Sequence, residues 1–221
     1  PGFGQFQVAS EEYLLFAQQF GATDILLNTP LIPGDGGKWN LSDLVKLRLR
    51  VEQFGMKLTA LENVPTNFYD HIMLNGPRRD EQIENMISTV RNLARAGIPI
   101  FGYNWMPSHV WRTPPALIRG GALATAYDHA LGSKYPLTHG REYSEEEMWQ
   151  NLEHWIKIIT PVAEEEGIRL GIHPCDPPVD KLGGIPQLLR SFESYKRLVE
   201  IYPSDSNGIE FCQGTFSEMK D

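Results

Sequence analysis

The sequence predicts an α/β fold, a (β/α)8 TIM barrel represented through about its sixth strand, as one domain over residues 1–221. Short apolar runs alternate with longer segments whose apolar residues recur at helical spacing, which is the pattern of repeated βα units. Four of the expected helices end at a glycine, and the next apolar run begins a few residues later. Six expected strands and five expected helices amount to three quarters of a barrel whose usual length is ~250 residues. We therefore expect a C-terminal part of the barrel to lie beyond residue 221.

Each expected strand is a short apolar run that stops at a turn signal. Prolines stop the second, third and fourth runs at Pro30, Pro65 and Pro107, and Pro177 with Pro178 stops the fifth. The expected strands are residues 2–6, 24–28, 57–62, 99–105, 169–173 and 208–214.

The expected helices carry capping signals at their ends. The second begins after Asn40, and the third ends at Gly97. The fourth opens with Ser144 and Glu147, which have the spacing of a capping box, and the fifth stops at Pro203. The expected helices are residues 10–20, 40–54, 80–96, 144–166 and 191–202.

A six-stranded open sheet is the alternative architecture. It is disfavoured because no dinucleotide-binding fingerprint follows the first strand. In either fold the connection over residues 107–143 is long and rich in Pro, Gly, Arg, His and Thr. Long connections without regular structure are uncommon unless they serve as lids or binding loops, so we expect this one to cover the site.

Composition narrows the class of protein. The 28 acidic residues exceed the 20 Lys and Arg, and the net charge of −8 with no basic run argues against nucleic acid or an anionic membrane as partner. No apolar run approaches a membrane span or a signal peptide, so a cytoplasmic location is expected. Two cysteines make no disulfide framework, and pairing of Cys175 with Cys212 is not expected there. Trp39 and Trp111 are candidates for a contact in a homo-oligomer.

Polar residues stand where five of the expected strands end, and in a parallel barrel those ends converge on one pocket. They are Asn28, Glu62, Asn104, His173 and Cys212. The imidazole of His173 and the thiolate of Cys212 can bind a divalent metal, but two ligands are too few for a site. Each residue also has an ordinary structural interpretation, His173 as a hydrogen-bonding histidine and Cys212 as a buried thiol. Glu62 is read equally well as a base or ligand and as one half of an ion pair.

Several stretches resemble the mannonate dehydratase family, in order and over nearly the whole chain. The most specific are Ile172-His173-Pro174-Cys175-Asp176-Pro177-Pro178 and Phe211-Cys212-Gln213-Gly214-Thr215. The others are Leu61-Glu62-Asn63-Val64-Pro65, Arg91-Asn92-Leu93-Ala94-Arg95-Ala96-Gly97-Ile98, Gly102-Tyr103-Asn104-Trp105-Met106-Pro107 and residues 159–169.

The resemblance implies a metal-dependent barrel of the xylose isomerase-like group that converts D-mannonate to 2-keto-3-deoxy-D-gluconate and water. It implies that His173 and Cys212 are ligands of a divalent metal, with Mn²⁺ expected and Fe²⁺ as the alternative. The family's remaining ligands and its acid and base residues come from the last two strands, which lie beyond this sequence. Cys175 is a departure, because the family commonly has Asp there.

Five residues are assigned roles by hypothesis. Asn104, His109 and Arg112 are expected to bind the hydroxyls and carboxylate of a sugar acid, and Glu62 and Asp176 to orient or join the metal ligands. Two other functions stay open from the sequence. One is a sugar isomerase or epimerase on the same barrel, and the other is a catalytically silent barrel fragment, whose open sheet edges would favour association.

Overall fold

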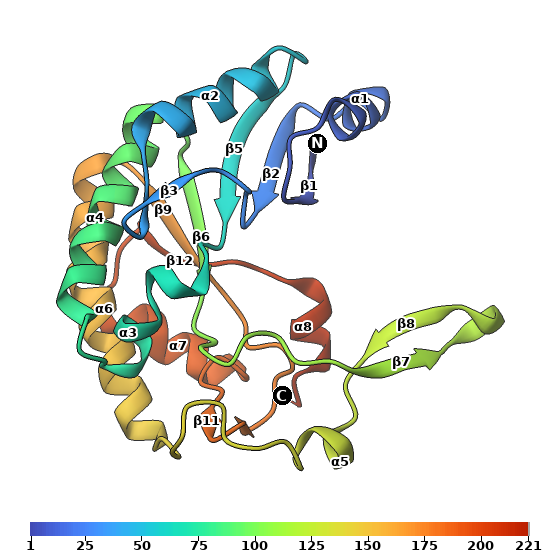
Figure 1. Cartoon of the computed structure of the whole chain (residues 1–221), viewed down its shortest axis with the longest axis vertical. Coiled ribbons are helices and arrows are strands. Elements are labelled where there is room, and N and C mark those ends of the chain that lie inside the picture. The colour runs from blue at the N-terminus through green and yellow to red at the C-terminus, as the bar shows by residue number, and fades with distance from the viewer. Residues whose placement is uncertain (221) are drawn as a thin grey trace.

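A computed structural model, which describes residues 1–220, contains one sheet of six parallel strands in the order β1-β2-β5-β6-β9-β12 (Figure 1). The order in the sheet is the order in the chain, with no point at which the winding reverses, as in a barrel and unlike a doubly wound sheet. The strands are β1 (Gly2–Phe6), β2 (Asp24–Asn28), β5 (Lys57–Glu62), β6 (Ile100–Asn104), β9 (Arg169–His173) and β12 (Asn207–Ile209).

The long helices form a single layer outside the curved sheet (Figure 1). Neighbouring helices pack in chain order, with α2 beside α4, α4 beside α6 and α6 beside α7. This one-sided cover excludes the open-sheet alternative, in which helices lie on both faces. The sheet is therefore part of a barrel. The helices are α1 (Glu11–Gln19), α2 (Leu41–Glu52), α3 (Asp70–Leu74), α4 (Arg79–Ala96), α5 (His129–Gly132), α6 (Glu145–Glu166), α7 (Phe192–Ile201) and α8 (Gln213–Glu218), with 3-10 turns at Thr66–Phe68 and Arg119–Gly121.

Local sequence explains where the long helices begin and end. Ser144 accepts a hydrogen bond from the Glu147 amide, while the Glu147 carboxylate accepts one from the Ser144 amide, which is the expected capping box. Gly97 and Gly167 close α4 and α6 with φ of 77° and 68°, a left-handed conformation that glycine adopts without steric cost.

Side chains alternate across the central strands. In β6, Phe101 and Tyr103 are buried beneath the helices, and Tyr103 meets Trp155 of α6 edge to face at 6.1 Å. Gly102 faces the concave side of the sheet, where it lines a cavity. The packed core thus lies between sheet and helices and leaves the concave side for a site.

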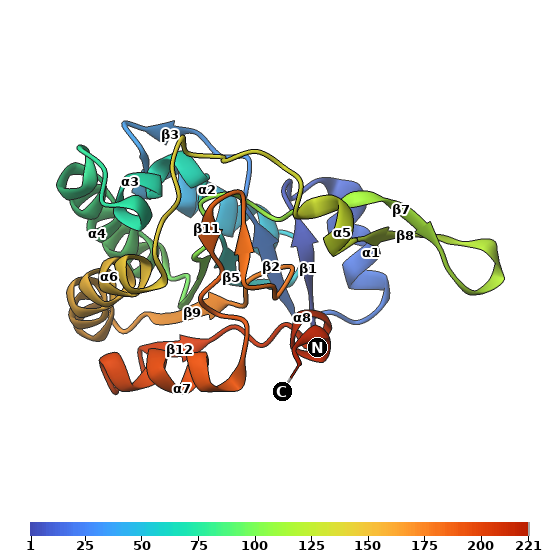
Figure 2. The ribbon, with the colours of Figure 1, turned by 90° about the horizontal axis from the view of Figure 1, so that it is seen from below.

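Three sequence expectations need correction. The last strand ends at Ile209, not near residue 214, because the Cys212 amide donates to the Glu210 carbonyl at 3.0 Å and turns the chain into α8. The connection 107–143 is not structureless, since it contains α5 and the antiparallel hairpin of β7 (Thr113–Leu117) and β8 (Leu123–Ala126), which reaches away from the body (Figure 2). Trp39 is fully buried and cannot mark a subunit contact.

Short antiparallel hairpins lie in two of the loops at the sheet's carboxyl edge. One pairs β3 (Gly34–Asp35) with β4 (Lys38–Trp39), and the other pairs β10 (Lys181–Leu182) with β11 (Ile185–Pro186). The 107–143 connection is fastened to the second, because Thr138 and Tyr143 donate their amides to the carbonyls of Gly183 and Gly184. Within residues 1–220, no helix combines the length and apolar character required to traverse a lipid bilayer.

Candidate metal centre

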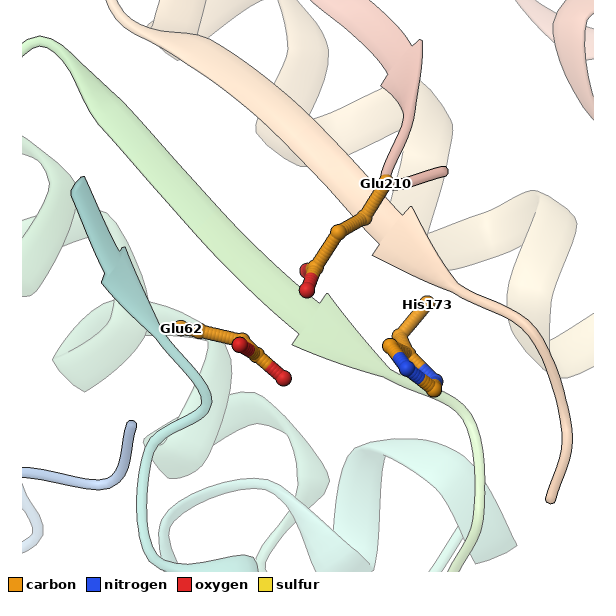
Figure 3. A group of neighbouring side chains, drawn as sticks. All are labelled: Glu62, His173 and Glu210. Atoms are coloured by element: carbon orange, nitrogen blue, oxygen red, sulfur yellow. The ribbon is translucent and has the colours of Figure 1, made fainter. Parts of the chain in front are cut away.

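Three side chains with oxygen or nitrogen donors meet at the carboxyl ends of the strands (Figure 3). Glu62 is the last residue of β5, His173 is the last residue of β9, and Glu210 directly follows β12. One ligand atom from each lies within 4.8 Å of those of the other two. This group of three is the candidate metal centre, because carboxylate oxygen and imidazole nitrogen are common ligands of divalent metals.

Glu62 is oriented by amide groups from its surroundings. Its Oε1 accepts hydrogen bonds from Nδ2 of Asn28 and Nδ2 of Asn63, both at 3.2 Å, and Gln5 Nε2 lies 3.5 Å from its Oε2. Asn28 ends β2, so the neighbouring strand supplies one of these donors. Glu62 is only 3% exposed, and these donors fix the position of both of its carboxyl oxygens.

His173 is held in one tautomer by its own backbone neighbour. Its Nδ1 lies 2.7 Å from the carbonyl oxygen of Pro174. A carbonyl can only accept, so Nδ1 carries the proton and donates it, which leaves the lone pair of the neutral ring on Nε2. A histidine that donates one ring N–H to a carbonyl and presents the other nitrogen is the usual form of a metal ligand.

Glu210 is the member of the group with a buried carboxyl oxygen that lacks a hydrogen-bond partner. Among the donors of residues 1–220, none forms a hydrogen bond to its buried Oε2. Burial, followed by repulsion from the Glu62 carboxylate, raises the pKa of Glu210 to about 9. Without a cation the Glu210 carboxyl therefore keeps its proton at neutral pH. A cation between the two carboxyl groups would offset their repulsion and favour loss of that proton.

Of the two glycines that face Glu210, Gly102 makes room for its carboxyl group and Gly171 does not have to. Gly102 and Gly171 are register partners on β6 and β9, and a Cβ at Gly102 would collide with Glu210 Oε2. A Cβ at Gly171 would lie 3.5 Å from Glu210 Cβ, which is ordinary contact. With Glu62 and Glu210, these glycines line a cavity of about 280 Å³ on the concave face of the sheet. A hollow of about 700 Å³ lies elsewhere, by the starts of α6 and α7, and none of the three donors lines it.

The donor set fits a divalent cation. It combines a carboxyl group held in place by amide donors, a second carboxyl with an unpartnered buried oxygen, and an imidazole nitrogen with a free lone pair. Oxygen donors with one imidazole suit Mn²⁺, Fe²⁺ or Mg²⁺ better than a soft, sulfur-seeking ion. Binding must displace the Glu210 proton, so the cation's affinity is expected to rise with pH.

Of the two predicted metal ligands, His173 lies in the candidate metal centre and Cys212 lies outside it. His173 belongs to the group of three, whereas Cys212 caps the N-terminus of α8, two residues after Glu210, and lies outside that group within residues 1–220. Its Sγ accepts a hydrogen bond from Thr215 Oγ1 at 3.4 Å. Ligation by Cys212 remains a prediction. Cys175 is fully buried, and burial raises the pKa of its thiol to about 12.

The two thiols are expected to differ in reactivity. Iodoacetamide at pH 8 should alkylate half-buried Cys212 in the full-length native protein and leave Cys175 unmodified, because only an accessible thiolate reacts. Peptide mass spectrometry measures this, with both cysteines modified in denaturant as the control. If Cys212 binds the metal, Mn²⁺ should protect it. Equal labelling with and without Mn²⁺ would remove Cys212 from the ligand set.

Arg112 and Asp176 bind each other. The Arg112 guanidinium donates to both carboxylate oxygens of Asp176, at 2.7 and 2.6 Å, and so joins the loops that follow β6 and β9. Asp176 lies outside the group of three donors. A substrate carboxylate would have to displace Asp176 to use Arg112, so the roles predicted for both residues stay predictions.

Asn104 and His109 lie on the β6 side of the site. Asn104 ends β6 beside His173, donates to Asn63 Oδ1 at 2.7 Å and accepts the Met106 amide at 3.1 Å. Its amide thereby supports the Asn63 that holds Glu62. His109 adopts a left-handed φ of 63°, and its Nδ1 is 3.2 Å from the Thr66 hydroxyl. Whether either side chain contacts a substrate stays a prediction.

Glu210 is the site residue that the sequence analysis missed. The sequence pattern predicts a strand over residues 208–214, which places Glu210 inside the strand and Cys212 near its end, whereas β12 stops at Ile209. The signal of Glu210 itself is a carboxylate directly after Gly208-Ile209, close to the strand end, as Glu62 is at the end of β5. A shorter last strand would have placed it at the strand end.

Comparison with known proteins identifies the family. The model of the D-mannonate dehydratase (UxuA) family matches residues 11–135 and 128–221. The chain belongs to this family. A mannonate dehydratase of Streptococcus pneumoniae (strain 70585) is 33% identical over 82% of this chain and 56% of its own length. One from Streptococcus agalactiae serotype Ia is 34% identical over 82% of this chain and 59% of its own. The chain thus spans a little over half the length of these relatives.

Solved structures agree with the family and the fold. The crystal structure of mannonate dehydratase from Streptococcus suis serotype 2 matches with a TM-score of 0.85 at 28% identity, over 98% of this chain and 65% of that one. More distant matches share the barrel fold alone. A xylose isomerase-like TIM barrel protein from Mycobacterium smegmatis gives a TM-score of 0.56 at 11% identity, over 92% of this chain and 56% of its own. The six-stranded sheet of this chain is therefore part of a TIM barrel, as the sequence predicted.

Proposed function

We propose that this chain carries the metal-binding half of a dehydratase that converts D-mannonate to 2-keto-3-deoxy-D-gluconate and water. Membership of the D-mannonate dehydratase family supports the reaction. The single structural observation that carries the proposal is the convergence of Glu62, His173 and Glu210 at the carboxyl ends of three strands. Active sites of this fold lie at that face of the barrel.

We propose Mn²⁺ as the resident cation, with Fe²⁺ as the alternative, held by Glu62, His173 and Glu210 together with Cys212. When bound, such a cation supplies Lewis-acid chemistry, which polarises substrate oxygen atoms and stabilises negative charge. A sugar acid needs this help, because the hydrogen next to its carboxylate is only weakly acidic and the neighbouring hydroxyl leaves poorly.

In that reaction, the residues of this chain would bind the cation and orient its ligand atoms. The carboxyl group of Glu62 is held in place by hydrogen bonds from Asn28, Asn63 and Gln5. His173 presents Nε2 because Nδ1 is engaged by the Pro174 carbonyl. Glu210 holds a proton at its carboxyl until the site is filled, and releases it on filling. Glu62 and the Oε2 atom of Glu210 are shielded from water, which strengthens their electrostatic interaction with a bound cation.

The test is product formation by the full-length protein with D-mannonate and Mn²⁺, followed by NMR. Appearance of the 2-keto-3-deoxy acid that stops on chelation supports the proposal. His173→Ala and Cys212→Ala should each reduce turnover at least ~100-fold, because each removes a proposed metal ligand. Unchanged turnover in both variants would refute the proposed site.

The isomerase or epimerase alternative is separated by the same experiment. A structure of L-ribulose 3-epimerase has a TM-score of 0.53 at 12% identity, so the fold is shared and does not choose between reactions. Incubation with ketoses distinguishes them, because only dehydration loses the oxygen at C3. A catalytically silent protein would form neither product. We further propose a cytoplasmic location, since the free thiols of Cys175 and Cys212 suit a reducing compartment.

A further inference from the structure

Tyr195 of α7 is buried beneath the metal centre without belonging to it. Its side chain is 2% exposed, and its hydroxyl donates to the carbonyl oxygen of Ile172 at 3.2 Å. Burial raises the pKa of this hydroxyl, so it stays protonated and acts as a donor. Ile172 directly precedes His173 in β9.

The same carbonyl also holds Glu210. The Glu210 amide donates to the Ile172 oxygen at 3.1 Å, one step beyond the last strand pair, Ile209 with Ile172. One oxygen atom thus receives two donors and joins the backbone of His173 to the backbone of Glu210. A carbonyl has two lone pairs, so both hydrogen bonds can form together.

The ring of Tyr195 reaches the segment that carries Cys212. It stacks on Phe216 of α8 with ring centroids 5.1 Å apart and an interplanar angle of 27°. Phe216 in turn donates its amide to the Cys212 carbonyl at 2.9 Å, in the first turn of α8. Tyr195 therefore contacts both the strand that ends in His173 and the helix that begins at Cys212.

We propose that Tyr195 is a positioning residue that sets the relative placement of His173 and the Glu210–Cys212 segment, and through it the affinity and coordination geometry of the cation. This inference rests on the proposed function, because it assumes that the group binds a metal. β12 is a three-residue strand at the sheet edge with a paired neighbour on one side, so its end needs support from elsewhere. The hydroxyl of Tyr195 supplies it from α7.

The test is Tyr195→Phe in the full-length protein, measured by titration with Mn²⁺ alone and by the visible spectrum of the Co²⁺-loaded form. We expect Mn²⁺ to bind ~10 to 100-fold more weakly, which is the usual effect of removing a hydrogen bond that orients metal ligands. The Co²⁺ bands, which report ligand geometry, should shift. Loss of one neutral hydrogen bond should lower the unfolding free energy of the metal-free protein only slightly.

Tyr202→Phe is the matched control, because Tyr202 immediately follows the same helix and its hydroxyl donates to Glu164 Oε2 at 3.2 Å, away from the centre. It should leave both metal readouts unchanged. A second variant, Phe216→Leu, removes the aromatic stacking and should shift the Co²⁺ bands while retaining an apolar contact.

The outcomes separate the two proposals. If wild type fails to bind Mn²⁺, the proposed metal site is refuted and this inference with it. If wild type binds Mn²⁺ and Tyr195→Phe binds equally well with an unchanged Co²⁺ spectrum, the positioning role alone is overturned. Equal losses in Tyr195→Phe and Tyr202→Phe would also overturn it, because they would show a general effect of α7 stability.

Discussion

Gly102→Ala is expected to weaken Mn²⁺ binding ~10 to 100-fold while the protein still folds. The added methyl would occupy the space of Glu210 Oε2 and would lie 3.3 Å from Cα and Cγ of Glu62 on the neighbouring strand. Glu210 can move because its carboxylate is the end of a flexible side chain, whereas β5 and β6 are paired by backbone hydrogen bonds. The variant should therefore lose the group of three donors before it loses the sheet. The strain should cost about 1–3 kcal/mol of unfolding free energy.

Gly171→Ala is the control for this prediction. Gly171 is the register partner of Gly102 on the next strand, and a methyl there would make ordinary contacts of 3.5 Å with Glu210 Cβ and N. Titration with Mn²⁺ should give a wild-type dissociation constant within about threefold, and chemical denaturation should show similar or slightly higher stability, as expected when glycine is replaced without strain. Equal loss of Mn²⁺ binding in the two variants would contradict the role assigned to Gly102.

The strand ends are where sequence reasoning succeeded, and the reason is physical. An apolar run followed by a proline locates the end of a buried strand to within a residue or so, and the barrel topology brings such ends together. Glu62 and His173 each end a strand that pairs on both sides, so the ladder extends to the last residue. Their convergence followed from two local patterns and one topological rule.

Glu210 could not be located in the same way, because β12 lies at the edge of the sheet. A strand with one paired neighbour can stop early, and the turn after Ile209 depends on a backbone hydrogen bond between Cys212 and Glu210 rather than on proline or glycine. The pairing of Arg112 with Asp176 was equally hidden, since it joins loops 64 residues apart. Sequence patterns indicate periodicity and turns. Neither the hydrogen bond between Cys212 and Glu210 nor the ion pair between Arg112 and Asp176 produces a pattern of that kind.

A cation bound at the candidate metal centre, as proposed, would explain why Gly102 and the unsatisfied Glu210 carboxyl occur together. Glu210 is a carboxyl in a place that destabilises its charge, next to Glu62, and nothing within residues 1–220 compensates its Oε2. Such an arrangement lowers the stability of the metal-free protein. A bound cation would neutralise both carboxylates and restore that stability. Relief of this destabilisation would contribute to the affinity for the cation. In the metal-free protein, the same destabilisation should make the unfolding free energy depend on pH.

Glu210→Gln is expected to remove a pH dependence of stability from the metal-free protein. The folded-state pKa of Glu210 is raised to about 9 from an ordinary value of 4.5, so between these values the native state holds a proton that the unfolded state has released. The stabilisation from that proton is complete below pH 4.5 and is lost as the pH rises through about 9. Wild type should lose roughly 1 kcal/mol of unfolding free energy per pH unit across this window from this one group.

Urea denaturation at pH 6, 7 and 8 measures the effect, with Glu153→Gln as the control. Glu153 is exposed and pairs with Lys157, which lowers its pKa, so it is ionised throughout this range and should leave the slope unchanged. Glutamine keeps the size of Glu210 without a proton to lose, so Glu210→Gln should be more stable than wild type at pH 8 when metal is absent. It should also bind Mn²⁺ more weakly, and its affinity should no longer rise with pH. A slope in Glu210→Gln equal to that of wild type would show that another group holds the proton and that Glu210 is ionised before the cation binds.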